Sequence, residues 1–248
     1  TKNGIRIHPD FSRRLSVVDA ENRELYISLG CALENIQIAA TRKGYHCMVK
    51  YPETNRECID INFDKAETDN PAPDKLFNYI SERQVTKCKY DKKPIPDEHI
   101  KMLRANNFSN TVDMQLFDGR KSFEQIIPFI IEANELQFNS REFINELVNW
   151  CRFSKKDARA KKDGIWSATM GMPQFGKKLG SLIMKNLMSA KSETNRLNKL
   201  MNHTAGILVF TTIQNNAEAW VKTGQAYQQF ALVSTMLKIR HAHLNMPC

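Results

Sequence analysis

The spacing of apolar and polar residues predicts two long helices, one near each end of the chain. In the first, residues 21–44, apolar side chains recur every three or four positions, and further apolar residues widen that face. A helix with such a wide apolar face is buried on most sides. Asp19 is expected to cap its start with a carboxylate, and Gly44 is a fitting stop. The second long helix is predicted over residues 216–239.

Shorter segments between these helices read as strands. Residues 4–8 alternate in polarity, residues 45–52 and 57–63 resemble strands, and residues 205–213 form a nearly continuous apolar run. Alternation is typical of a half-buried strand, and a continuous run is typical of a strand in a buried sheet. The remaining expected elements are a linker at 67–74, helices at 76–83, 121–136, 140–153 and 180–202, and an irregular, Gly-rich cover segment at 161–180.

The two long helices resemble each other when one is set against the other at an offset of 194 residues. Gly30 then meets Gly224, and each helix follows a Gly-Ile strand, at Gly4 and at Gly206. A glycine inside a helix costs about 1 kcal/mol relative to alanine, so a shared one indicates close backbone packing in both helices. The pattern indicates an internal duplication. The alternative is that two amphipathic helices resemble each other without common origin.

Charge and composition leave several partner classes open. The chain has 248 residues, 42% hydrophobic content and a net charge of +9. This charge permits a nucleic acid, an acidic lipid surface or an anionic cofactor as partner, although a basic protein with none of these is an equal alternative. The basic residues are dispersed, and the local clusters at 155–164 and 176–180 are short.

Neither a membrane span nor a metal site is expected. No run of about 18 apolar residues occurs, so we predict no transmembrane helix and no membrane partner. The six cysteines include no Cys-x-x-Cys pair, a pattern that fits reduced thiols in a cytoplasmic protein. His241 and His243 have no nearby Cys, Asp or Glu partner, so they are weak evidence for a metal site.

Residues 83–106 look like the beginning of a protein. A cationic, strand-like piece, Arg83-x-x-x-Lys87-x-x-Tyr90, is followed by a Lys-Pro-Ile-Pro turn and an acidic entry to a helix. This motif resembles the amino-terminal motif of the nitroreductase superfamily. Three further segments resemble one branch of it, the Acg-like proteins: residues 23–40, Trp150-Cys-Arg with Asp163-Gly-Ile, and Leu244-Asn-Met-Pro.

The resemblance implies an α+β fold in which antiparallel-rich sheets pack with helices. Two related halves would form an intramolecular pseudo-dimer, with the first half in residues 1–75 and the second in residues 76–248. A lid-like segment at 155–200 would cover the flavin. The family's Ser/Asn-rich loop with Gln-Pro-Trp is expected to precede residue 1, and its carboxyl-terminal basic residue to follow Cys248. At most one FMN site per chain is therefore expected, in a monomeric pseudo-dimer or a homo-oligomer.

The resemblance also implies which residues bind FMN. Arg83 can offer a planar fork and Lys87 a point charge to the phosphate. Val85 stands where the family usually has a Ser or Thr hydroxyl. The loop at 243–247 would lie along the flavin ring, where backbone N–H groups and apolar side chains tune its electronics. Its expected cofactor-binding residues are His243, Leu244, Asn245 and Pro247. The alternative for Arg83 and Lys87 is a solvated basic face.

Three functions remain open at this point. The first is an oxidoreductase that uses FMN to move electrons from NAD(P)H to a quinone or nitro-type acceptor; its catalytic residues stay unknown. The second is a catalytically silent protein that binds or stores flavin under a lid, motivated by the Gly-rich segment 161–180. The third, ranked last, is a nucleic-acid-binding module, since charge alone supports it and no recognition motif occurs.

Overall fold

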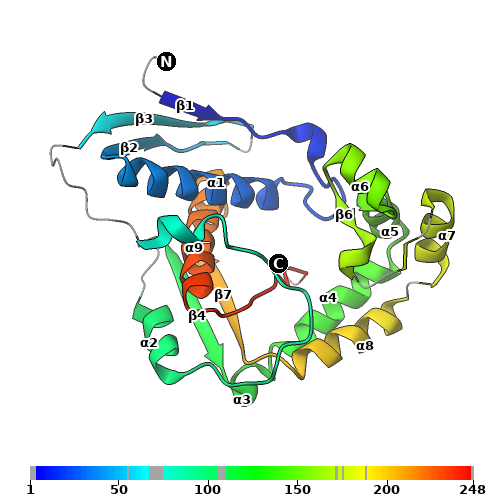
Figure 1. The fold of residues 1–248 in the computed structure, drawn as a ribbon. Helices are drawn as coiled ribbons and strands as arrows, with labels where there is room; N and C mark the ends of the chain where they lie inside the picture. The colour runs from blue at the N-terminus through cyan, green and yellow to red at the C-terminus, as the bar shows by residue number, and fades with distance from the viewer. Residues whose placement is uncertain are drawn as a thin grey trace. The chain divides into compact units, whose positions relative to one another are not determined.

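The computed structural model describes residues 4–54, 56–66, 75–105, 110–170, 173–174, 176–187 and 189–246. This part of the chain is a mixture of helices and small, mainly antiparallel sheets, which agrees with the expected α+β class (Figure 1). The chain divides into two compact units. The first unit comprises Thr1–Gln84, Ile95–Leu116 and Leu208–His241, and the second comprises Val85–Pro94, Phe117–Ile207 and Ala242–Cys248.

The first unit holds the long helices and a three-stranded sheet. Its elements are β1 (Gly4–Ile7), η1 (Phe11–Arg13), α1 (Arg23–Arg42), β2 (Tyr45–Lys50), β3 (Ile59–Lys65), η2 (Lys75–Tyr79), α2 (Asp97–Ala105) and α9 (Ala217–Met236). Strands β4 (Val112–Asp118) and β7 (Gly206–Thr212) pair with each other, and the boundary between the units falls within both strands.

The three-stranded sheet has the order β1-β3-β2 and is antiparallel throughout. Ile61 of the central strand pairs with Ile5 on one side and with Val49 on the other. Ile61 is buried in one core cluster with Tyr26 and Leu33 of α1. The three strands predicted for this region are therefore confirmed, with ends that differ by up to two residues.

Helix α1 begins and ends where local chemistry dictates. The Asp19 carboxylate accepts hydrogen bonds from the backbone N–H groups of Glu24 and Leu25, both at 3.0 Å. It therefore satisfies two N–H groups of the first turn that have no partner within the helix. The N-cap position itself is Asn22, so the prediction was right about the bond and wrong about the position. Gly44 has a positive φ of 78° directly after the helix, which confirms it as the stop.

Helices α1 and α9 cross (Figure 1), and their backbones approach each other closely at Gly30 and Gly224. A Cβ atom on Gly30 would lie 2.0 Å from the carbonyl oxygen of Val221, and one on Gly224 would lie 2.0 Å from that of Ile27. Neither position can hold a side chain without separating the backbones. The close backbone packing predicted for both glycine-bearing helices is confirmed, and the structure shows that each is the other's partner. The expected burial of α1 is confirmed too, since between Asn22 and Ala40 only Ser28 is exposed.

The second unit is mainly helical. Its elements are α3 (Arg120–Phe123), α4 (Ile127–Asn139), α5 (Arg141–Trp150), β5 (Cys151–Arg152), α6 (Lys155–Lys161), β6 (Ile165–Trp166), η3 (Ser167–Met170), α7 (Lys177–Leu187) and α8 (Ala190–Met201). Helices α4 and α8 share a buried cluster of Phe123, Ile127, Ile130, Leu197 and Met201.

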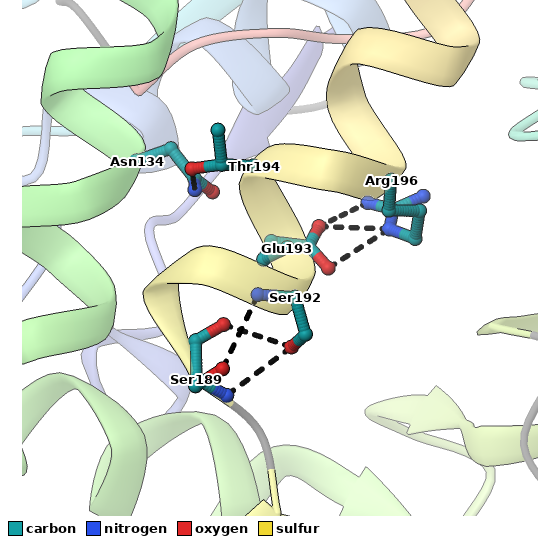
Figure 2. A network of polar contacts seen from close by, with 6 residues as sticks. All are labelled: Asn134, Ser189, Ser192, Glu193, Thr194 and Arg196. Carbon is teal, nitrogen blue, oxygen red and sulfur yellow. Dashed lines mark hydrogen bonds and ion pairs between the residues drawn. The ribbon is translucent and has the colours of Figure 1, made fainter.

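The single helix predicted over 180–202 is wrong, because α7 and α8 are separate helices. Helix α8 starts at a capping box, in which the Ser189 and Ser192 side chains each accept a hydrogen bond from the other's backbone N–H (Figure 2). This reciprocal pair satisfies N–H groups that a continuous helix would have bonded internally. The segment 161–180 is irregular only in part, since it contains β6 and η3 and runs into α7.

Other expectations also need correction. Residues 83–96 form neither helix nor strand, so the strand-like reading of Arg83 to Tyr90 is wrong. The helix expected at 76–83 is the 3-10 helix η2. Strand β7 is only half-buried, in a two-stranded sheet, and therefore is not part of a buried sheet. Strand β4 and helix α6 had no counterpart in the prediction.

Candidate functional site

Arg83, the first expected phosphate ligand, lies in the first unit near the helix crossing. Burial raises the pKa of Tyr227 on α9 to about 12, and the neighbouring Arg83 guanidinium opposes that shift through its charge and a hydrogen bond. Burial likewise raises the pKa of Cys31 on α1 to about 11, again against the positive charge of Arg83. Arg83 is thus half-buried among groups of α1 and α9 rather than on a solvated face.

Lys87, the second expected ligand, lies in the second unit near α8. Lys87 is exposed as a residue, but neighbouring protein atoms remove part of the water around its ammonium group. This desolvation lowers the pKa of Lys87, and the positive charge of Arg196 lowers it further. Arg196 is held by Glu193, with Nε at 2.8 and 2.9 Å from the two carboxylate oxygens (Figure 2). Two neighbouring cations are a donor set that a phosphate can use. Sequence reasoning missed Arg196, which lies 109 positions away from Lys87 along the chain.

The loop at 243–247 belongs to the second unit as well. Leu244 packs, with Met246, against the apolar cluster of α4 and α8, whereas His243 and Asn245 are exposed. Pro247 lies outside the described residues. Lys87 and the described residues of this loop therefore fall in one unit, and Arg83 falls in the other.

The two motifs at 150–152 and 163–165 come together as a structural clamp. Strands β5 and β6 pair in parallel, and the Arg152 guanidinium bonds the Asp163 carboxylate at 2.8 Å and the Asn149 carbonyl at 2.8 Å. The Arg152 side chain is 7% exposed. Gly164 has a φ of 69°, and a Cβ there would lie 2.2 Å from the Trp150 carbonyl oxygen. These residues hold backbone together and leave little room for a ligand.

The α1–α9 crossing makes the same polar contact twice. Gln229 donates to the Glu34 carboxylate at 2.6 Å, and Gln228 donates to the Asn35 side-chain oxygen at 2.8 Å. At the offset of 194 residues, Glu34 corresponds to Gln228 and Asn35 corresponds to Gln229. Each of the two contacts is therefore the counterpart of the other. The two glycines behave in the same reciprocal way, since Gly30 faces Val221 and Gly224 faces Ile27.

A cavity of about 440 Å³ lies in the first unit beside this crossing. A volume of this size suits a small molecule. Glu34, which lines it, is only 4% exposed. The described residues that line it are Glu34, Gln37, Ile38, Thr41, Tyr51, Asn110, Thr111, Lys222, Gln225 and Gln229. Sequence reasoning missed this site, although an acidic residue within the apolar face of α1 was a visible signal.

A chain of hydrogen bonds organises the cavity wall. The Tyr51 hydroxyl donates to Gln225 at 3.0 Å, and the Gln225 amide donates to Glu34 at 3.2 Å. Lys222 lies over the Tyr51 ring, 5.1 Å from its centre, and is paired with Glu218 at 2.6 Å. The wall therefore presents a buried carboxylate, amide groups and an ammonium whose charge is already matched.

The described cysteines, Cys31, Cys47, Cys58, Cys88 and Cys151, form no disulfide with one another. Among the described residues no three His, Cys, Asp or Glu side chains gather in a way that could hold a metal ion. Within the same part of the chain, no helix combines the length and the apolar character that a membrane span requires. The chain matches no protein-family model and no curated protein.

Proposed function

We propose that this chain is an FMN-binding, nitroreductase-like protein that transfers electrons from NAD(P)H to a quinone or nitro-type acceptor. In this proposal two related halves form an intramolecular pseudo-dimer. The observation that carries it is the reciprocal crossing of α1 and α9 at Gly30 and Gly224. A fused duplication of one subunit would place its two copies of a helix in such a twofold-like contact, because a symmetric interface pairs equivalent residues.

The residues of the proposed site have distinct tasks. Lys87 and Arg196 would hold the FMN phosphate through charge-assisted hydrogen bonds. Backbone groups of the loop that contains His243 and Asn245 would lie along the flavin ring. The flavin itself supplies the hydride and electron chemistry, so the protein contributes binding, orientation and exclusion of water.

The absorption spectrum of the purified full chain tests flavin binding. We expect visible flavin bands after incubation with FMN and desalting, and we expect Lys87→Ala combined with Arg196→Ala to abolish them. Lys89→Ala is the matched control, since Lys89 is exposed two positions from Lys87. A chain that never retains FMN, or a control that loses it equally, would refute the assignment.

Reduction of the bound flavin separates the two flavin hypotheses. Rapid bleaching of the flavin bands by NADH or NADPH, followed by reoxidation with a quinone, is the result expected of the oxidoreductase. A retained flavin that neither nucleotide reduces would refute turnover and would support the silent flavin-storing alternative.

A further inference from the structure

The charge of the chain is divided unequally between the two units. The second unit contains 19 Lys and Arg against 10 Asp and Glu, whereas the first contains 17 of each, so the whole net charge of +9 belongs to the second unit. Within it, the excess lies in residues 151–200, which hold 12 Lys and Arg against 3 Asp and Glu. Such an asymmetry is typical of proteins that bind a negatively charged partner.

Helix α7 combines exposed apolar side chains with positive charge. One side packs on α5 (Figure 1), where Met184 is buried in a cluster with Phe153 and a Cβ on Gly180 would lie 2.4 Å from the Phe153 ring. The opposite side carries Leu179 and Leu182, which are 51% and 59% exposed. At 3.6 residues per turn, these two leucines point away from the side that holds Gly180 and Met184.

Exposed lysines lie next to the two leucines. Lys178 precedes Leu182 by four positions and Lys185 follows it by three, so both are its neighbours on the helix surface. Lys177, at the start of the helix, is exposed as well, and residues 164–192 contain no Asp or Glu. A lysine can lay its alkyl chain along an apolar surface while its ammonium group stays in a polar layer. Leucines beside such lysines are typical of helices that lie in a membrane interface.

A second helix of the same unit carries exposed apolar residues beside the opposite charge. Helix α4 exposes Phe129 and Leu136 to 63% and 69%. The exposed charges on this helix are Glu132 and Glu135, and α4 contains no Lys or Arg. A negatively charged surface would repel α4 and attract α7. Charge therefore distinguishes the two apolar faces and selects an anionic partner for α7.

We propose that α7 lies on the surface of a membrane that contains acidic phospholipids. Leu179 and Leu182 enter the boundary between headgroups and acyl chains, and the three lysines of α7 pair with lipid phosphates. A nucleic acid would attract the lysines too, but its phosphate backbone offers nothing to two leucines. A helix that lies on the surface needs no membrane-spanning stretch. The proposal thus departs from the expectation of no membrane partner, which rested on the lack of such a stretch.

Co-sedimentation of the full chain with lipid vesicles measures this binding. Vesicles with about 30% phosphatidylserine in phosphatidylcholine are the probe, and vesicles of phosphatidylcholine alone are the match without net charge. We expect the chain to bind the first kind and to be released as the salt concentration rises, because salt screens the lysines. The surface shares no residue with the proposed flavin set. Since flavin retention is read by absorption, loss of vesicle binding leaves the flavin assignment standing, and the reverse.

Replacement of lysines tests the role of charge. The triple variant Lys177→Gln, Lys178→Gln, Lys185→Gln should weaken vesicle binding about a hundredfold, at about fivefold for each lysine. The control removes the same charge from the first unit by replacing three exposed lysines with Gln, and it should bind as the wild type does. These lysines are Lys43, Lys65 and Lys101.

Replacement of leucines tests the role of the apolar surface. Leu179→Ala with Leu182→Ala should weaken binding at least about tenfold, since less apolar surface leaves water. The matched control is Phe129→Ala with Leu136→Ala on α4, which should leave binding unchanged. All four side chains are exposed, so both variants should fold, as circular dichroism can verify. Leu182→Trp should bind several-fold more tightly, because Trp prefers the membrane interface.

Other results would overturn the proposal. These are equal binding to vesicles with and without phosphatidylserine, binding to neither kind, or an equal loss of binding in the α7 variants and their controls. Gel shifts with duplex DNA and RNA test the other anionic partner. Salt-sensitive binding of nucleic acid without binding to vesicles would assign the lysines of α7 to nucleic acid and exclude the membrane assignment.

Discussion

The contact between Gly30 and Gly224 makes a quantitative prediction for Gly30→Ala. The added Cβ would lie 2.0 Å from the Val221 carbonyl oxygen and 2.9 Å from the Gly224 Cα. Ordinary contact begins at 3.4 Å, so the backbones must separate by about 1.4 Å at this point. Both neighbours are backbone atoms, which cannot swing aside as a flexible side chain would.

The expected loss of stability is the balance of two opposing effects. Overpacking a well-filled interface costs about 1–3 kcal/mol, and a rigid backbone neighbour favours the upper end. Replacement of a mid-helix glycine by alanine returns about 1 kcal/mol in helix propensity. We therefore expect the free energy of unfolding to fall by about 2 kcal/mol or more. Because the crossing is reciprocal, Gly224→Ala should cost a similar amount.

Urea unfolding followed by far-UV circular dichroism measures these changes. The double variant should lose less stability than the two single losses added together, since the first alanine already separates the helices for the second. Gly176→Ala is the control, because nothing lies within 4 Å of a Cβ there, and it should stay within about 0.5 kcal/mol of wild type. Wild-type stability in Gly30→Ala, or strictly additive losses, would refute close contact at the crossing.

Three other predictions concern buried polar groups. Arg152→Lys removes the planar guanidinium that bonds the Asp163 carboxylate, and it should lower the free energy of unfolding by about 3 kcal/mol, measured by thermal melting. An unchanged melting temperature would contradict a structural role for this ion pair. Burial raises the pKa of Tyr26 to about 12 from 10.0. Its contribution to the free energy of unfolding is therefore full below pH 10 and is lost as pH rises towards 12. In urea unfolding the wild type should lose stability more steeply at alkaline pH than Tyr26→Phe does, and parallel curves would contradict this. Burial raises the pKa of the Cys151 thiol to about 11, so a disulfide reagent at neutral pH should label exposed Cys88 well before Cys151, as mass spectrometry can verify; equal rates would contradict that burial.

The sequence predicted those features whose causes are local. Apolar periodicity set the extent of α1 and α9, and Gly44 ended α1 because a left-handed residue stops a helix. Asp19 was recognised as a capping carboxylate, although a turn places it three positions earlier than a standard N-cap. The shared phase of Gly30 and Gly224 also predicted close backbone packing in both helices, since a mid-helix glycine is costly unless a neighbour needs the space, although it did not name the neighbour.

Features that depend on distant partners could not be read in this way. Strand β4 pairs with β7, about 90 positions later, and it was missed although its residues 112–116 alternate in polarity. The break between α7 and α8 depends on Ser189 and Ser192 forming a capping box, where periodicity alone continues through both helices. Lys87 is next to Arg196 only because the chain folds back onto α8.

The helix crossing shows how one backbone arrangement can carry two chemically different sides. The glycine contacts and the two hydrogen bonds from side-chain amides are related by the same offset of 194 residues, so both sides of the crossing have the same backbone geometry. The side chains are not shared, because Glu34 corresponds to neutral Gln228, and Gln225 corresponds to Cys31. Packing fixes the crossing and leaves these positions free to differ in charge without loss of the fold.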